Sequence, residues 1–400
     1  QTEYTSETYE AEEQGTDSRT AKAGDKVLLT GGENAFIADF TSNQTEHAAF
    51  PFSIWNKTMR AVMNDYQEEM MINPPCGGVM ELRKSISSYL KEFCAMYVRP
   101  EQIIIGAGTE YLYSILIQLL GRNVCYGVEN PGYPKIAKIY RSMGVKYEYI
   151  DLDEEGTSAK KLEEKKVDIM HISPSHHFPT GMVMPISKRY ELLGWVTREK
   201  ERYIIEDDYD SELRLAGKPI PSLQSIDVSG KVIYINTFAK TLCSTVRISY
   251  MVLPEALAEK YYRELSFYSC TVSNFEQYTL AAFMNAGAFE KHINRLRNYY
   301  QHKRDLILST FLREPLGKYI TISEEDSGVH FLMHVNTSMS EQEFLLKTRA
   351  KGIRLATLSS FYNAEQKDSR YENTYVMNYS FVNCDRLEYV AQTLYKIIHP

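Results

Sequence analysis

The sequence contains no apolar run long enough to span a bilayer, and no apolar signal segment near its first residue. We therefore expect no membrane contact and a cytoplasmic location. The net charge of −7 over 400 residues gives the chain as a whole no attraction for nucleic acid. The six cysteines form no C-x-x-C pair and lie beside no histidine at zinc-site spacing, which favours reduced thiols and predicts no metal site.

Three regions of different composition divide the chain. Residues 1–35 are rich in Glu, Thr and Ser and poor in large aliphatic residues, which predicts a disordered linker. Residues 36–270, which start with an N-terminal arm over 36–75, alternate short apolar runs with helical patterns. Residues 271–400 begin with a long helical pattern, expected to be an interdomain helix, and then mix strands with helices. They predict a smaller α+β domain.

Seven strand-like runs in the large region predict a mostly parallel sheet with helices on both faces. The run at 248–254 follows the one at 231–238 too closely for a helical crossover, so we expect it to pair antiparallel. In such sheets ligands bind beyond the carboxyl ends of the strands, which makes the residues there candidates for a site. The seven runs are QIIIG, NVCYGVE, KYEYIDL, VDIMHIS, RYIIEDD, KVIYINTF and ISYMVLP.

Acids and a lysine end two successive predicted strands. Glu206, Asp207 and Asp208 are adjacent at a strand end, and burying three acids there costs free energy unless a cation pairs with them. A solvated turn or a metal site is the alternative, although further ligands at metal spacing are missing. Pyridoxal 5′-phosphate fits better: Asp207 would partner its pyridine nitrogen, Tyr209 would reach its phenolate oxygen and Lys240 would hold its aldehyde as a Schiff base. A surface role is the ordinary reading of a lone lysine.

Two turns and an arginine could complete such a site. Gly108 and Thr109 follow a strand and open a helix, so free N–H groups there point at an anion, although an ordinary tight turn fits the pattern too. Arg247 could close a phosphate cup together with the Thr237 hydroxyl. Tyr133, after the next strand, could stack on the pyridine ring or pack locally.

Taken together, these segments resemble the fold type I aminotransferases, and more closely the effector domain of MocR/GabR-type transcription regulators. The resemblance covers residue 36 to the C-terminus and implies a head-to-tail homodimer. It also implies the roles named above for Lys240, Asp207, Tyr209, Tyr133, Gly108, Thr109, Thr237 and Arg247. The segments that carry it are FPFSIW, CGGVMELRKSISSYL, GAGTE, VENPGYP, SPSHHFPTGMVMP, IIEDDYDSELR, YINTFAKTL, FEKHINRLRNYY and GIRLATLSSFY.

The motif SPSHHFPTG indicates the regulator branch of this resemblance. Enzymes of the fold usually carry Asn before the proline, whereas this chain has Phe178 before Pro179. His176 falls where such regulators also have His. We expect it to line the cofactor pocket, with packing in the core as the alternative.

The sequence departs from the resembled families at two places. Regulators of this kind carry an N-terminal winged helix-turn-helix, which residues 1–35 lack, so we interpret the chain as an excised effector domain whose DNA-binding domain is missing. Val376 stands where aminotransferases place an arginine to grip a substrate carboxylate, and an apolar side chain cannot do this. Arg354 or Arg370 could substitute, but surface positions are favoured for both.

The resulting prediction is a sensor domain that binds pyridoxal phosphate and a small amine or amino-acid effector. The effector amine would displace Lys240 from the aldehyde by transimination. Without a carboxylate grip, a substrate loses the orientation that turnover needs, so we expect little transamination. A stand-alone aminotransferase is the first alternative. A sensor of pyridoxal phosphate itself, with no amine effector, is the second.

Overall fold

A seven-stranded sheet carries the predicted site. In the computed structural model, which describes residues 36–42, 44–216, 220–326, 328–363 and 371–399, the strand order is β2-β8-β7-β6-β5-β3-β4. Strand β8 runs antiparallel to both of its neighbours, as the sequence predicted, and the other strands are mutually parallel. The strands are β2 Ile103–Gly106, β3 Cys125–Asn130, β4 Lys146–Asp151, β5 Ile169–Ile172, β6 Tyr203–Asp208, β7 Val232–Thr237 and β8 Ser249–Val252.

Successive side chains of a strand pack into separate cores on opposite faces of the sheet. Ile103 and Ile105 of β2 pack into a cluster on one face, whereas Ile104 packs into a separate cluster on the other. Strand side chains point alternately to opposite faces, so an unbroken apolar run is explained by a sheet that is covered on both sides. The linker predicted for residues 1–35 lies outside the described residues.

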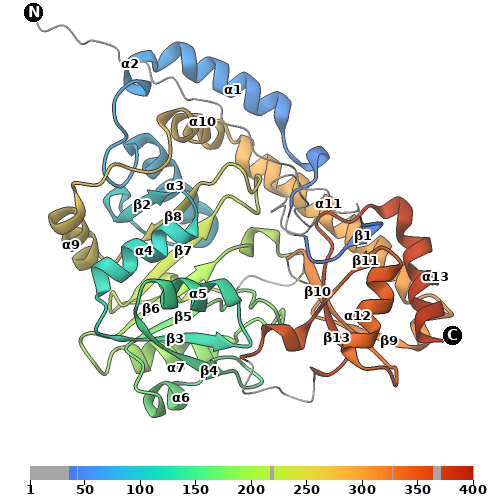
Figure 1. Cartoon of the computed structure of the whole chain (residues 1–400). Helices are drawn as coiled ribbons and strands as arrows, with labels where there is room; N and C mark the ends of the chain where they lie inside the picture. The colour runs from blue at the N-terminus through green and yellow to red at the C-terminus, as the bar shows by residue number, and fades with distance from the viewer. Residues whose placement is uncertain (1–35, 43, 217–219, 327, 364–370, 400) are drawn as a thin grey trace, which may run out of the picture. The chain divides into compact units, whose positions relative to one another are not determined.

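Helices cover both faces of this sheet, which confirms the predicted fold class (Figure 1). One face is covered by α4 Thr109–Leu120, α5 Pro134–Ser142 and α9 Glu255–Leu265. The other is covered by α1 Phe52–Asp65, α3 Met80–Cys94, α10 Asn274–Asn285, α6 Ala159–Glu164, α7 Ile186–Val196 and α8 Leu223–Ile226, while the short α2 spans Gln67–Met70.

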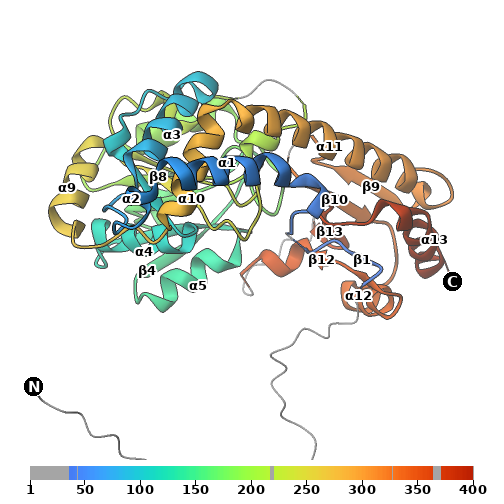
Figure 2. The same cartoon turned by 90° about the horizontal axis from the view of Figure 1, so that it is seen from above.

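A smaller antiparallel sheet forms the C-terminal part, in the order β12-β13-β10-β9. The long helix α11 runs from the large sheet's helices to this smaller sheet (Figure 2). The predicted division at residue 270 stays a prediction. The elements are β9 Ile320–Ser323, β10 His330–Val335, β12 Ala356–Thr357, β13 Thr374–Asn378, α11 Ala288–Phe311, α12 Glu341–Ala350 and α13 Leu387–Ile398.

The N-terminal arm begins on the C-terminal part of the chain. Strand β1 (Ala38–Asp39) pairs in parallel with β11 (Ile353–Arg354). The Asn378 backbone N–H donates to the Phe40 carbonyl at 2.9 Å, which ties the arm to β13 as well. Only afterwards does α1 pack on α10 beside the large sheet.

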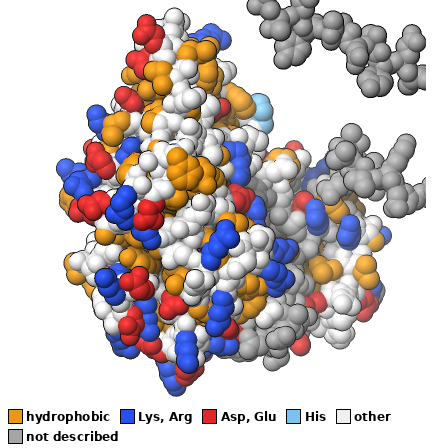
Figure 3. All heavy atoms as spheres, turned by 60° about the vertical axis from the view of Figure 1, so that its left-hand side comes forward, with side chains coloured by type: hydrophobic (Ala, Val, Ile, Leu, Met, Phe, Trp, Pro, Cys, Tyr) orange, Lys and Arg blue, Asp and Glu red, His pale blue; other side chains and the backbone are white. Residues whose placement is uncertain are grey.

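The surface mixes both signs of charge. On the face in Figure 3, acidic and basic side chains lie interspersed with hydrophobic patches. None of the described helices is both long and apolar enough to cross a membrane.

Candidate functional site

The predicted site residues leave two adjacent parallel strands at the same edge. Asp208 at the end of β6 is in register with Asn236 near the end of β7. The segments that follow these two strands carry Tyr209 and Lys240, so the sheet itself brings the predicted residues to one edge.

Asp207 is buried, and only one of its two carboxylate oxygens has a hydrogen-bond partner among the described residues. The Tyr113 hydroxyl, from α4, donates to its Oδ2, and His171 Nε2 lies 3.5 Å from the same oxygen. Its Oδ1 is buried with no hydrogen-bond partner among the described residues. A buried unsatisfied carboxylate oxygen is costly, and a protonated pyridine nitrogen would satisfy it. Sequence reasoning missed Tyr113 and His171 because neither lies near Asp207 along the chain.

The two neighbouring acids, Glu206 and Asp208, accept hydrogen bonds from other groups of the protein. Glu206 accepts hydrogen bonds from the backbone N–H groups of Leu223 and Gln224, both at 2.9 Å. Asp208 accepts from the hydroxyls of Ser211 and Tyr234. Burial raises the pKa of Glu206 to about 7 and that of Asp208 to about 6. Glu206 also lies 3.8 Å from the guanidinium of the buried Arg189, whereas among the described residues the only basic side chain at ion-pair distance from Asp207 is that of His171.

Lys240 lies three residues beyond the end of β7 (240 − 237). Burial lowers the pKa of its amine below the ordinary value, and the charge of Asp210 acts in the opposite direction. The amine also lies close enough to His330, on β10, to lower the pKa of that imidazole, after burial and His176. A lysine with a lowered pKa has more of the neutral amine that can react with an aldehyde.

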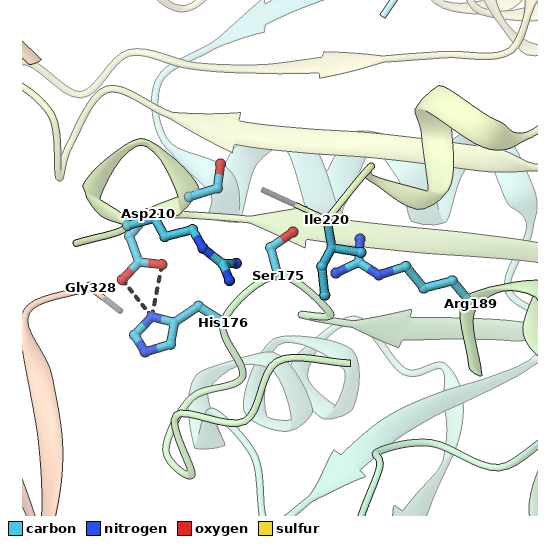
Figure 4. A pocket seen from close by; sticks show the side chains of 8 residues that line it. Ser175, His176, Arg189, Asp210, Ile220 and Gly328 are labelled. Carbon is cyan, nitrogen blue, oxygen red and sulfur yellow. Dashed lines mark hydrogen bonds and ion pairs between the residues drawn. The ribbon is translucent and has the colours of Figure 1, made fainter. Parts of the chain in front are cut away.

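Tyr209, His176 and Asp210 form a hydrogen-bonded row, and the charge of Asp210 acts on Lys240. His176 Nδ1 lies 2.9 Å from Asp210 Oδ2 and 3.2 Å from the Tyr209 hydroxyl. In Figure 4, His176 and Asp210 face each other across this contact, with Gly328 beside them. Burial and the surrounding acids, Asp210 first, raise the pKa of Tyr209 well above its ordinary value. The phenol therefore keeps its proton and can donate it.

Gly328 brings the smaller sheet against this row. Its φ of +64° lies in the left-handed region, and a Cβ there would stand 2.3 Å from His176 Cε1. Only glycine allows this close approach without displacement. The loop before β10 is thereby seated on the His176–Asp210 pair.

The predicted phosphate cup is built around Gly108. Its φ is +92°, and a Cβ there would stand 2.2 Å from Arg247 Nη2. Arg247 Nη2 lies 2.7 Å from Glu110 Oε2 and donates to the Ala107 carbonyl at 3.3 Å. Thr109 begins α4 directly after Gly108.

Hydrogen bonds fix the Thr237 hydroxyl at the edge of the cup, and Arg247 has an unusual backbone conformation there. The Thr237 hydroxyl accepts from Ser249 Oγ at 2.8 Å and from the Ala239 N–H at 3.1 Å. Arg247 has a φ of +53°, an uncommon conformation for a residue with a side chain and one that concentrates at functional sites.

Tyr133 extends from the end of β3 toward the same region. The residue is 43% exposed, and its ring lies edge-on to that of Phe178, with centroids 6.0 Å apart. Burial raises the pKa of the Tyr133 hydroxyl, with the charge of Lys135 acting in the opposite direction and those of Glu110 and Asp207 adding to the rise.

Val376 lies in an apolar cluster rather than in a polar grip. It is buried, pairs with Leu332 across β13 and β10, and packs with Leu358 and Phe178. Arg354 lies 3.5 Å from Asp39 at the β1–β11 ladder, and Arg370 falls outside the described residues. Within the described ranges, no group of three or more His, Cys, Asp or Glu side chains could hold a metal ion.

Comparison with known proteins identifies the family of the chain. Residues 37–370 match the family Aminotransferase class I and II. The uncharacterized HTH-type transcriptional regulator YdeL of Bacillus subtilis is 39% identical over 330 residues, which are 82% of this chain and 71% of YdeL. The probable rhizopine catabolism regulatory protein MocR of Rhizobium meliloti is 30% identical over 80% of this chain and 65% of MocR.

A solved structure confirms the fold. Kynurenine aminotransferase of Pyrococcus horikoshii superposes with a TM-score of 0.77 at 22% identity, over 92% of this chain and 91% of the other. The family match supports pyridoxal 5′-phosphate, the cofactor predicted from the sequence. The chain therefore belongs to the aminotransferase class I and II family and, within it, to the MocR-type transcriptional regulators.

Proposed function

We propose that this chain is the sensor part of a transcription regulator, which binds pyridoxal phosphate at the edge of the large sheet and a small amine or amino acid beside it. Ligand binding would control a DNA-binding domain. The observation that carries the proposal is the buried Oδ1 of Asp207, which has no partner among the described residues at the strand ends where Lys240 also emerges.

Each predicted residue has a role in this proposal. The Lys240 amine would hold the aldehyde, and Asp207 would pair with the pyridine nitrogen. Tyr209, held by His176, would donate to the phenolate oxygen, and Tyr133 would cover the ring. When bound, the cofactor supplies an electrophilic aldehyde and a ring that withdraws electrons. The phosphate would contact Gly108, Thr109, Thr237 and Arg247.

The apolar surroundings of Val376 support sensing over turnover. Transamination of an amino acid requires that the substrate carboxylate be fixed, and Leu332 and Leu358 beside Val376 offer it no charge or donor. The same observation favours a second candidate, in which occupancy by pyridoxal phosphate is itself the signal.

Exposed apolar side chains support a homodimer, which we propose to be head-to-tail. Met71 is 81% exposed and Ile72 is 64% exposed, and Phe267 is 73% exposed. Large apolar side chains that face solvent are often covered in an oligomer.

The absorbance spectrum of the purified protein with added cofactor tests the proposal. We expect a visible band that is lost in Lys240→Ala. Lys231→Ala is the matched control, because Lys231 precedes the opposite end of β7 and its Nζ contacts the Lys200 carbonyl. A panel of amines and amino acids is then titrated against the band.

The titration separates the candidates. A shift with one amine that persists supports the effector sensor. Bleaching followed by recovery with a keto acid would instead identify an aminotransferase. A band that no amine moves, with DNA affinity of the complete regulator set by cofactor alone, would favour the sensor of pyridoxal phosphate. Absence of any band would refute the cofactor site.

A further inference from the structure

Glu110 occupies the cup in which we place the cofactor phosphate. We propose that its carboxylate is an internal competitor for the phosphate, which makes binding of the cofactor weaker and more reversible than the other cup residues alone would allow. The inference rests on the proposed function, because it concerns the same site.

Three donors around the cup are engaged by this one carboxylate. Arg247 Nη2 lies 2.7 Å from Glu110 Oε2, and Lys135 Nζ contacts Oε1. The backbone N–H of Glu110 itself, in the first turn of α4, also donates to the carboxylate. A basic side chain and the free N–H groups of a helix N-terminus are the groups that bind a phosphate.

The carboxylate also lies within the space of the cup. A Cβ built on Gly108 would stand 2.2 Å from Arg247 Nη2 and 2.8 Å from Glu110 Oε2. The guanidinium and the carboxylate therefore meet directly over the glycine that opens the cup. A phosphate that reaches the same donors must displace the carboxylate or share them with it.

Glu110 keeps its negative charge at any ordinary pH. Burial alone would raise the pKa of Glu110, but the hydrogen bonds from Lys135, from its own backbone and from Arg247 outweigh burial and lower the pKa to about 2. A fixed negative charge beside a phosphate opposes binding of the phosphate through Coulomb repulsion.

The side chains of this cluster are partly exposed, so their ion pairs can give way to an incoming phosphate. Those of Glu110, Lys135 and Arg247 are 29%, 48% and 51% exposed, and ion pairs at this exposure contribute little to folding. Competition for donors, rather than stability, is therefore the consequence of this cluster that an experiment can detect.

The test compares ligands with and without a phosphate. The dissociation constants of pyridoxal phosphate and of pyridoxal are measured by absorbance titration at low salt for the full chain and for Glu110→Gln. We expect Glu110→Gln to bind pyridoxal phosphate about tenfold more tightly and pyridoxal unchanged, because only the phosphate meets the carboxylate. Apo Glu110→Gln should also gain more thermal stability from inorganic phosphate than the wild type does.

Glu255→Gln is the matched control. Glu255 also pairs with an arginine, Arg99, at 3.2 Å, but Arg99 precedes β2 whereas the cup follows it. Neither ligand should change affinity in this variant. If the amide destabilises the fold, Glu110→Ala removes the same carboxylate and the titration is repeated.

The failures of the two proposals differ. Unchanged or weaker binding of pyridoxal phosphate by Glu110→Gln, or an equal gain for pyridoxal, would overturn the competitor role of Glu110 while the visible band remains. A protein that shows no band with any variant would overturn the cofactor site instead.

Discussion

The substitution Gly328→Ala tests how tightly the smaller sheet packs against the site. In Gly328→Ala the new Cβ would stand 2.3 Å from His176 Cε1 and 2.5 Å from Asp210 Oδ2. Neither of these side chains is flexible enough to withdraw freely, because both are buried and hydrogen-bonded to each other. The loop before β10 or the His176–Asp210 pair must therefore shift.

Two costs add in this variant. The φ of +64° costs a residue with a side chain about 1–2 kcal/mol, and insertion into a packed contact costs a further ~1–3 kcal/mol. Gly144→Ala isolates the first cost, since Gly144 has a φ of +69° and a Cβ there would have no atom within 4 Å.

The assay is urea unfolding of both variants and the wild type, without cofactor. We expect Gly328→Ala to lose about 2 kcal/mol more unfolding free energy than Gly144→Ala. We also expect weaker cofactor binding in Gly328→Ala alone, because His176 would move from the Tyr209 hydroxyl. Equal destabilisation of the two variants would refute the tight contact at Gly328.

Three further predictions concern other groups. Asp207→Asn should weaken binding of pyridoxal phosphate about a hundredfold in the same titration, since a buried ion pair loses one charge; an unchanged affinity would argue against the pyridine partner. Burial raises the pKa of Glu129 from an ordinary 4.5 to about 8. The protonated side chain therefore adds to the unfolding free energy below pH 4.5, and this contribution is lost as the pH rises from 4.5 through 8. Glu129→Gln should flatten the decline in unfolding free energy over that range, and a profile identical to the wild type would contradict it. Met71→Asp should shift the protein toward monomer in sedimentation experiments; an unchanged mass would exclude Met71 from the interface.

The sequence predicted the large sheet well because its strands are covered on both faces. Continuous apolar runs such as Ile103–Ile105 mark this arrangement, and the short connection before β8 indicated its antiparallel direction. The β1–β11 pair could not be predicted, because strands of two residues carry no periodic pattern.

The candidate site was predicted at its strand ends and missed in its surroundings. Asp207 and Lys240 follow directly from the positions of β6 and β7 in the sequence. Tyr113 and His330 come from α4 and β10, and only the three-dimensional packing brings them to the site. Glu110 was visible as part of a turn, but nothing in the sequence indicates that it engages Arg247.

The β1–β11 ladder has a mechanical consequence. Residue 36, where the described unit starts, is anchored through β1 to strands at the C-terminal end of the chain, before α1 reaches the large sheet. Any displacement of the smaller sheet would therefore carry β1 with it, because the Phe40 carbonyl also accepts from the Asn378 N–H of β13. The ladder therefore ties the start of the N-terminal arm to the C-terminal part of the chain rather than to the large sheet.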